Sequence, residues 1–274
     1  MKTQRNLSTS ILIAGLVMIS PLANATLIYS QDFEALDTGD LHNQAGFTVD
    51  DGNRTYTVTT GGLSYSNGGV NHGGGDQRLV LGRTGTGTFS AAHVNFTPTD
   101  SDHIYFSFLL RYAAANTTNS MFFALSDTVS LNKSAASVFV GNPNSFQARA
   151  YPDSPDIVDA ETDNFGNPSP NTTYLMVGKL SKADPTGNYD RFQLLANPDS
   201  LTEPATWGGT VDMDMTIDSI DRLYFFIGGS SNDFQMDDIR VGTSYDSVVI
   251  PEPGTLVLLG VALGAALLAH RRRK

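Results

Sequence analysis

The chain has 274 residues and no cysteine, and its 28 acidic residues outnumber its 17 basic residues, so its formal net charge is −11. An excess of carboxylates repels phosphate groups, which argues against nucleic acids and anionic membrane surfaces as partners. Without cysteine no disulfide can form, so a hydrophobic core must supply most of the stability.

Residues 1–25 have the pattern of a secretory signal peptide. A basic start is followed by an apolar run from Ile11 to Ile19, and then by the small residues Ala23 and Ala25 on either side of one asparagine. This order is the one that signal peptidase recognises and cleaves. We therefore predict an N-terminal signal helix and a mature chain that begins at Thr26.

The residues that follow alternate between strand-like runs and turn-rich loops. About twelve short runs are rich in β-branched and aromatic residues, with Gly, Asn, Asp or Pro in almost every gap. From Val211 to Asp218 apolar and polar residues alternate strictly, as expected for a strand with one buried face. No window has the period of a soluble amphipathic helix. The pattern predicts an all-β, two-sheet antiparallel sandwich over residues 26–249.

We expect seven large apolar side chains to point into the space between the two sheets. They are Phe106, Phe108, Val177, Phe192, Leu194, Phe225 and Ile227.

A glycine-rich stretch between residues 61 and 87 includes the string His72-Gly73-Gly74-Gly75. Some lipases carry such a string in their oxyanion loop, but their chemistry also needs a G-x-S-x-G elbow, which this sequence lacks. The stretch also lacks the G-K-[ST] ending of a phosphate-binding loop. We interpret it as a series of turns between early strands.

The second half of the chain resembles the concanavalin A-like, LamG-like jelly rolls of secreted bacterial proteins. The resemblance lies in a hairpin over 173–198 that ends in Asn-Pro, a strand over 220–229, and a last strand with the order Asp-Asp-Ile-Arg-Val-Gly-Thr from Asp237 to Thr243. The early segment 27–36 is similar to the first strand of that family. The resemblance implies a jelly-roll sandwich in which the first and last strands pair.

That pairing would bring acidic residues from the two ends of the domain together. Asp32 and Glu34 end the first strand, and Asp237 and Asp238 lie in the last. Jelly rolls often tie their termini with Ca²⁺, which prefers carboxylate and carbonyl oxygens. No cofactor is required by the sequence, and the alternatives here are a structural Ca²⁺ or solvent-facing charge.

The sequence shows no recognisable catalytic pair. Jelly rolls that hydrolyse glucans carry E-x-D-x-E or E-x-D-x-x-E on one strand, because acid and nucleophile need two neighbouring carboxylates. The mature chain has only Glu34, Glu161 and Glu203 before its tail, and none begins such a motif. The one tryptophan, Trp207, is a candidate platform for a sugar ring, with loop packing as the alternative.

Residues 250–274 form a tail with three parts. Pro251, Glu252 and Pro253 precede an uncharged run over 255–269, and Arg271, Arg272 and Arg273 follow near the end. Fifteen helical residues rise about 23 Å, at the short end of what spans a bilayer core of about 30 Å. The basic cluster favours the cytoplasmic side, so a transmembrane helix here would leave the domain outside.

This order closely resembles the PEP-CTERM sorting signal of Gram-negative bacteria. In that family exosortase, an integral-membrane enzyme, recognises Pro-Glu-Pro and cleaves near it during export. An ordinary tail anchor and a single-pass helix are the alternatives, but neither accounts for the tripeptide. The resemblance implies transient insertion in the inner membrane, with signal peptidase and exosortase as processing partners.

The sequence therefore predicts an exported, exosortase-processed protein of the cell surface or extracellular matrix. We expect it to be non-enzymatic, and either to bind exopolysaccharide or to serve as a structural biofilm component. Two alternatives stay open. One is a lectin-like receptor for a defined glycan, and the other is a glycoside hydrolase or polysaccharide lyase with unrecognised catalytic residues.

Overall fold

A computed structural model describes most of the region between the two predicted sorting signals. The described residues are 26–49, 54–73, 75–83, 91–112, 120–127, 136–141, 145–151, 161–228 and 234–250. The predicted signal helix over 1–25 and the predicted transmembrane helix over 255–269 lie outside them. Within these ranges no helix is long and apolar enough to cross a membrane.

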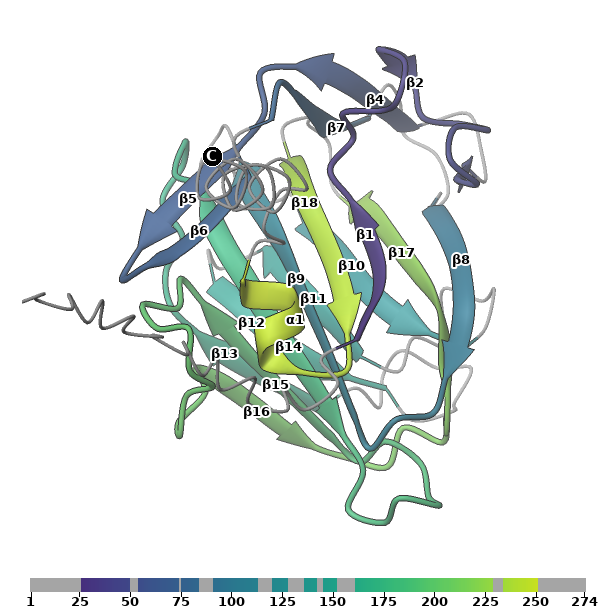
Figure 1. Ribbon diagram of the computed structural model, residues 1–274, viewed down its shortest axis with the longest axis vertical. Helices are drawn as coiled ribbons and strands as arrows, with labels where there is room; N and C mark the ends of the chain where they lie inside the picture. Colours follow the sequence, from purple (N-terminus) through teal and green to yellow (C-terminus); the bar gives the residue numbers. More distant parts are fainter. Residues whose placement is uncertain are drawn as a thin grey trace, which may run out of the picture.

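Two large antiparallel sheets face each other, and a small hairpin and one short helix lie outside them (Figure 1). The first sheet has the order β16-β15-β14-β9-β18-β7-β4-β2, and β1 also pairs with β18. Its strands are β1 (Leu27–Gln31), β2 (Gly39–Asp40), β4 (Arg54–Thr60), β7 (Gln77–Arg83), β9 (His103–Tyr112), β14 (Tyr174–Ser181), β15 (Arg191–Ala196), β16 (Gly209–Asp212) and β18 (Phe234–Gly242).

The second sheet has the order β13-β12-β11-β10-β17-β8-β3. Its strands are β3 (Thr48–Val49), β8 (Ala92–Thr99), β10 (Ser120–Ser126), β11 (Ala136–Gly141), β12 (Ser145–Ala150), β13 (Glu161–Phe165) and β17 (Ile220–Gly228). The hairpin consists of β5 (Ser64–Asn67) and β6 (Val70–Gly73), and the helix is α1 (Tyr245–Val249). The predicted all-β, two-sheet antiparallel sandwich is confirmed, while the flanking signal and membrane helices lie outside the described residues.

The first and last strands of the domain pair, as the jelly-roll resemblance implies. Strand β1 runs antiparallel to the second half of β18, with Ser30 opposite Arg240 and Gln31 opposite Ile239. The backbone N–H of Thr243 also donates to the carbonyl of Thr26 at 3.0 Å. The predicted start of the mature chain is therefore joined to the strand that leads toward the sorting tail.

The main core lies between the two sheets and is rich in phenylalanine. Phe106 and Phe108 of β9 stack near Phe123 of β10, with ring centroids 5.2 and 4.2 Å from it. Gly178 lies opposite Phe106 in β14, and a Cβ at this position would come within 2.1 Å of the Phe106 ring. Only glycine therefore fits beneath this ring without a shift in the core.

Six of the seven predicted core residues belong to this main cluster: Phe106, Phe108, Phe192, Leu194, Phe225 and Ile227. The prediction for Val177 was wrong, because this residue points to the outer face of the first sheet. It is buried there in a second cluster, under α1 and the β5–β6 hairpin. Tyr245, Val248 and Val249 of α1 belong to the same cluster.

Two other expectations from the pattern need correction. The alternating segment from Val211 to Asp218 is a strand only as far as Asp212, and it then turns irregularly, with Thr216 at a φ of 56°. The short helix α1 was not expected. Ser244 caps it, because its hydroxyl accepts from the backbone N–H of Ser247, whose hydroxyl in turn accepts from the Ser244 N–H.

Candidate functional site

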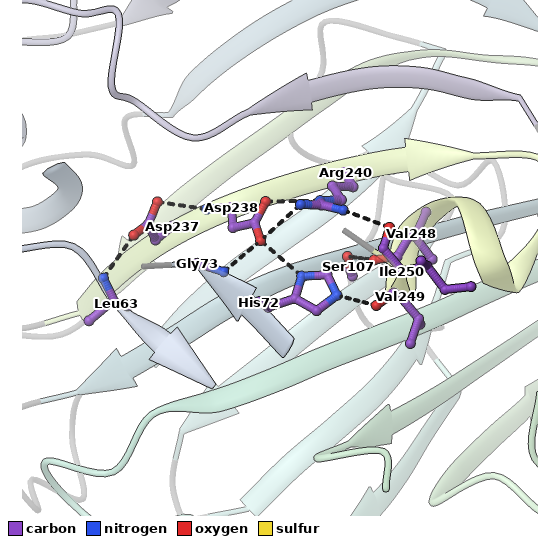
Figure 2. Close-up of polar contacts among 10 residues, drawn as sticks. All are labelled: Leu63, His72, Gly73, Ser107, Asp237, Asp238, Arg240, Val248, Val249 and Ile250. Carbon is purple, nitrogen blue, oxygen red and sulfur yellow. Dashed lines mark hydrogen bonds and ion pairs between the residues drawn. The ribbon is translucent and has the colours of Figure 1, made fainter. Parts of the chain in front are cut away.

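A β-bulge in β18 brings two consecutive carboxylates toward the small hairpin. The register of β18 against β9 shifts between Asp237 and Arg240, and Asp238 has a φ of 45°, in the left-handed region. In a regular strand, neighbouring side chains point to opposite faces. The bulge lets both carboxylates reach the region of β5 and β6 (Figure 2).

Asp238 is the centre of a buried ionic network. Its Oδ2 atom lies 2.9 Å from His72 Nδ1 and accepts from the backbone N–H of Gly73, also at 2.9 Å. Its Oδ1 atom accepts from Arg240 Nε at 2.9 Å. The side chains of His72 and Asp238 are 0% and 8% exposed, so the pair is shielded from water.

The same network holds the backbone of the last described residues. His72 Nε2 lies 2.8 Å from the carbonyl of Val249, and Arg240 Nη1 donates to the carbonyl of Ile250 at 3.0 Å. From the neighbouring strand β9, the buried hydroxyl of Ser107 donates to the carbonyl of Val248 at 2.6 Å. Figure 2 shows these contacts converging on the end of α1.

We refer to the four side chains that make this arrangement as the terminal clamp: His72, Ser107, Asp238 and Arg240. Three of them contact the main chain of the C-terminal segment, and Asp238 positions two of those three. The partners of the two His72 nitrogens, the carboxylate of Asp238 and the carbonyl of Val249, are both acceptors, so the ring links the end of α1 to the ionic network.

The two neighbouring aspartates have opposite pKa shifts. Burial works against ionisation of Asp238, but the hydrogen bond from His72 and the positive charge of Arg240 outweigh it and bring the pKa to about 2. Burial raises the pKa of Asp237 to about 7, although the backbone N–H groups of Leu63 and Asp238 donate to it. Asp238 is thus held as an anion, whereas Asp237 titrates near neutral pH.

The residues predicted to bind Ca²⁺ contact several different parts of the domain. Asp32 and Asp238 border one cavity of about 220 Å³, but Arg240 lines it too and supplies a positive charge. Glu34 accepts from the backbone N–H of Gln77 at 2.7 Å. In the described part of the chain no group of three or more His, Cys, Asp or Glu side chains could hold a metal ion. The Ca²⁺ site is therefore untested, and the partners that Asp237 and Asp238 already have favour a domain without the cation.

We expect the mature domain to melt at the same temperature in excess chelator and in millimolar Ca²⁺. The reason is that Asp237 and Asp238 already accept hydrogen bonds from protein donors, and Arg240 already balances the charge of Asp238. Differential scanning calorimetry in the two buffers measures this directly. A melting temperature that rises with Ca²⁺ concentration would show that the cation binds the folded state.

Trp207, the candidate sugar platform, packs against the second cluster. Its ring meets that of Tyr245 edge-on, with centroids 6.4 Å apart and an interplanar angle of 88°. The side chain is partly buried and covers one side of α1. This geometry matches the loop-packing alternative, since the ring is used to cover apolar residues of the domain itself.

A polar cavity of about 770 Å³ lies on the outer face of the first sheet, beyond the part covered by α1. It is formed by outward-pointing residues of β9, β14, β15 and β16 and by adjoining loops. Its lining residues are His103, Lys179, Ser181, Lys182, Ala183, Asp190, Arg191, Gln193, Asp212, Met213 and Asp214.

Several charges in and around this cavity are compensated. Arg191 forms an ion pair with Asp212, and Lys179 Nζ donates to Glu203 at 2.7 Å. Asp214 accepts from the Asn188 side-chain amide and from the backbone N–H of Thr216. The cavity therefore presents hydrogen-bonding groups of both kinds without a strong excess of one charge.

Sequence reasoning missed this cavity. The alternation from Val211 to Asp218 predicted only that Asp212 and Asp214 lie on the polar face of a strand, and nothing in the sequence linked them to His103. The polar residues at outward positions of β14 and β15 could have indicated the cavity. Lys179 and Gln193, for example, lie opposite each other in the two strands. That register depends on the hairpin and cannot be read from one strand alone.

The predicted sorting and processing residues lie outside the described residues. They are Ala23, Ala25, Pro251, Glu252, Pro253, Arg271, Arg272 and Arg273. Their roles stay predictions from the sequence, and the structure describes the chain up to the residue before Pro251.

Comparison with solved structures supports the fold. The globular domain of T. cruzi calreticulin aligns with a TM-score of 0.52 and 12% identity, over 91% of this chain and 100% of that one. A carbohydrate esterase from the Shiga toxin-encoding bacteriophage phi24B aligns with a TM-score of 0.49 and 10% identity, over 80% and 99%. An alginate lyase from Aplysia kurodai aligns with a TM-score of 0.48 and 10% identity, over 80% and 100%. At 12% identity the likeness to the calreticulin domain shows the sandwich fold and nothing of the function. The other two alignments have TM-scores below 0.5 and add nothing to it.

Comparison of sequences identifies the tail. No curated protein sequence matches the chain. A family model described as the PEP-CTERM protein-sorting motif matches residues 249–274, which confirms the resemblance drawn from Pro251 onward. The chain therefore carries a PEP-CTERM protein-sorting motif directly behind an all-β, two-sheet sandwich domain.

Proposed function

We propose that this chain is an exported, exosortase-processed surface protein whose sandwich domain binds a hydroxyl-rich polysaccharide without cleaving it. The sorting motif at 249–274 supports export and sorting at the membrane. The observation that supports binding is the polar cavity of about 770 Å³ on the outer face of the first sheet. Its volume falls within the range of roughly 300–1,000 Å³ that is usual for ligand sites.

The lining of the cavity favours a neutral sugar chain over a charged one. Hydroxyl groups both donate and accept, and the side chains of Ser181, Gln193 and Asp214 offer both kinds of partner. The basic side chains Lys179 and Arg191 are already paired with Glu203 and Asp212. Without the two end segments, 27 acidic residues face 11 basic ones, so the domain as a whole repels an anionic polymer.

The described geometry supports binding more than catalysis. A lyase that used Tyr105 as its base would need this phenol to ionise readily. Burial raises the pKa of Tyr105 instead, and so do the hydrogen bond to Glu203 and its charge. Asp212 is engaged in an ion pair with Arg191, and Asp214 accepts hydrogen bonds from Asn188 and Thr216, so both carboxylates already have partners within the domain.

Co-sedimentation with the producer's own exopolysaccharide tests the proposal. We expect the mature protein to co-sediment without forming new reducing or unsaturated ends. Replacing two cavity residues together, His103→Ala and Gln193→Ala, should weaken binding about tenfold or more, since each lost hydrogen bond contributes about 1 kcal/mol. Thr55→Ala, on the exposed surface of β4 and outside the cavity lining, is the matched control and should bind normally.

Each other outcome has a definite meaning. New reducing or unsaturated ends would show an enzyme. Equal binding by the cavity variant and the control would place the binding site elsewhere. No binding by the unmodified protein would leave a structural matrix role and reject the cavity as a glycan site.

A further inference from the structure

The last described residues are fixed to the domain immediately before the sorting motif. The side chains of Val248 and Val249 are fully buried, and Tyr245 is 4% exposed. The carbonyls of Val248, Val249 and Ile250 are each held by one side chain of the terminal clamp (Figure 2). The next residue in the sequence is Pro251, the first of the Pro-Glu-Pro motif.

The clamp contacts are made to three consecutive main-chain carbonyls. Such contacts fix the path of the backbone whatever the side chains are, and they come from two strands of the first sheet and from the small hairpin. Asp238 links the parts, because it holds both His72 and Arg240 in place. The site therefore has the form of a receptor for the chain's own C-terminal segment.

Few residues separate the clamp from the predicted membrane segment. Only four residues, 251–254, separate Ile250 from the apolar run that begins at Thr255. Fully extended, they span about 14 Å. The polar layer on each side of a bilayer core is itself roughly 5–8 Å thick. With the clamp closed, the folded domain would be held almost against the membrane, with little room for an enzyme around the motif.

Release of the clamp would change this distance substantially. The segment from Tyr245 to Ile250 contributes six more residues, or about 20 Å when extended. The tether between the domain and the apolar run would then reach about 34 Å.

We propose that the terminal clamp controls access to the Pro-Glu-Pro motif: closed, it fixes Ile250, the residue before the motif, to the domain, and its opening lengthens the tether so that exosortase can reach the tripeptide. This inference rests on the proposed export and processing of the chain. It makes the clamp residues determinants of how fast this protein is processed, although His72 and Ser107 lie far from the motif in sequence.

A reversible lock provides the sharpest test. The chain has no cysteine, and a Cβ built on Gly242 lies 3.0 Å from Cβ of Ser247 in α1. A disulfide needs Cβ atoms about 3.5–4.5 Å apart, so Gly242→Cys/Ser247→Cys can form one if α1 shifts slightly and the carbonyl of Thr26, 2.9 Å from the new Cβ, moves away with β1. An exported protein meets an oxidising compartment in which the bond can persist.

Full-length protein is expressed in a Gram-negative host that carries exosortase, and loss of the tail is followed over time by intact mass. We expect the oxidised double variant to be processed at least tenfold more slowly than wild type. Added reductant should restore its rate. The single variants Gly242→Cys and Ser247→Cys carry the same side-chain changes without the crosslink, so they serve as matched controls and should be processed at least as fast as wild type.

An opening variant tests the opposite direction. Ser107→Ala removes the hydrogen bond to the Val248 carbonyl and leaves the charged network intact. We expect it to be processed several-fold faster, provided that its melting curve shows a folded domain. Processing of the oxidised lock at the wild-type rate would overturn the inference while leaving the proposed export intact. A wild-type chain that keeps its tail in this host would overturn the proposed processing itself, and the inference with it.

Discussion

Replacing Asp238 with alanine should cost the mature domain about 3–5 kcal/mol of stability, because the change leaves buried charged groups without their partner. His72 and Arg240 would lose the carboxylate between them, and the backbone N–H of Gly73 would lose its acceptor. For a domain of this size the melting temperature should fall by roughly 6–20 °C. Thermal unfolding followed by circular dichroism measures the shift.

The control for this prediction is an ion pair in a different environment. Arg191 and Asp212 also form a close pair, but their side chains are 51% and 61% exposed. Exposed pairs contribute about 0–1 kcal/mol, so Asp212→Ala should change the melting temperature by only a few degrees. Similar losses in the two variants would show that burial does not give the Asp238 network its stabilising role.

The position of Asp238 shows which part of the fold the sequence could indicate. The order Asp-Asp-Ile-Arg-Val-Gly-Thr placed residues 237–243 in the last strand, and the pairing of this strand with β1 is confirmed. The bulge was not predictable, since an aspartate with a φ of 45° departs from the conformation of a regular strand. What requires this conformation is the hairpin, which supplies partners for both carboxylates.

His72 illustrates why the buried network could not be predicted. Its neighbours in the sequence are glycines and polar residues, which are typical of a turn, and we interpreted them as one. In the structure His72 lies in β6 and contacts a residue 166 positions away. No local period marks such a contact, because it depends on where the hairpin is placed against the first sheet.

The buried faces were predictable only where one sheet covers the other. The prediction that Phe106, Phe108 and Phe192 point into the main core is confirmed. The same reasoning failed for Val177, because α1 and the hairpin bury part of the outer face as well. An apolar pattern on both faces of a strand indicates that both faces are buried, but it does not indicate which element covers each face.

The stability of the mature domain should rise as the pH falls from 8 to about 5, and Asp237 should cause part of this rise. Burial raises the pKa of Asp237 from 3.8 to about 7. Above pH 7 the carboxyl is ionised in both the folded and the unfolded chain, and the folded state carries the cost of the buried charge. Between pH 7 and about 4 the folded state takes up a proton before the unfolded state does, which stabilises it, by on the order of 2–4 kcal/mol in total.

Asp238 sets the lower limit of this gain. Its pKa is about 2 in the folded state, below the ordinary value of 3.8, so its contribution is present above pH 4 and is lost as the pH falls toward 2. The two shifts together predict greatest stability between about pH 4 and 5. A protein that lacks a buried carboxyl of raised pKa does not gain stability in this way as the pH falls, so its greatest stability lies at a higher pH.

Asp237→Asn separates this effect from the general relief of negative charge at lower pH. Asparagine does not titrate, and its amide oxygen still accepts from the backbone N–H of Leu63, as Asp237 Oδ2 does. Urea unfolding at pH 8 and pH 5 should therefore show a smaller gain in the variant than in the unmodified domain. All other carboxyls are common to both proteins, so the difference between the two gains reports on Asp237 alone. Equal gains would mean that Asp237 is ionised in the folded domain across this range, and that backbone donors outweigh burial at this position.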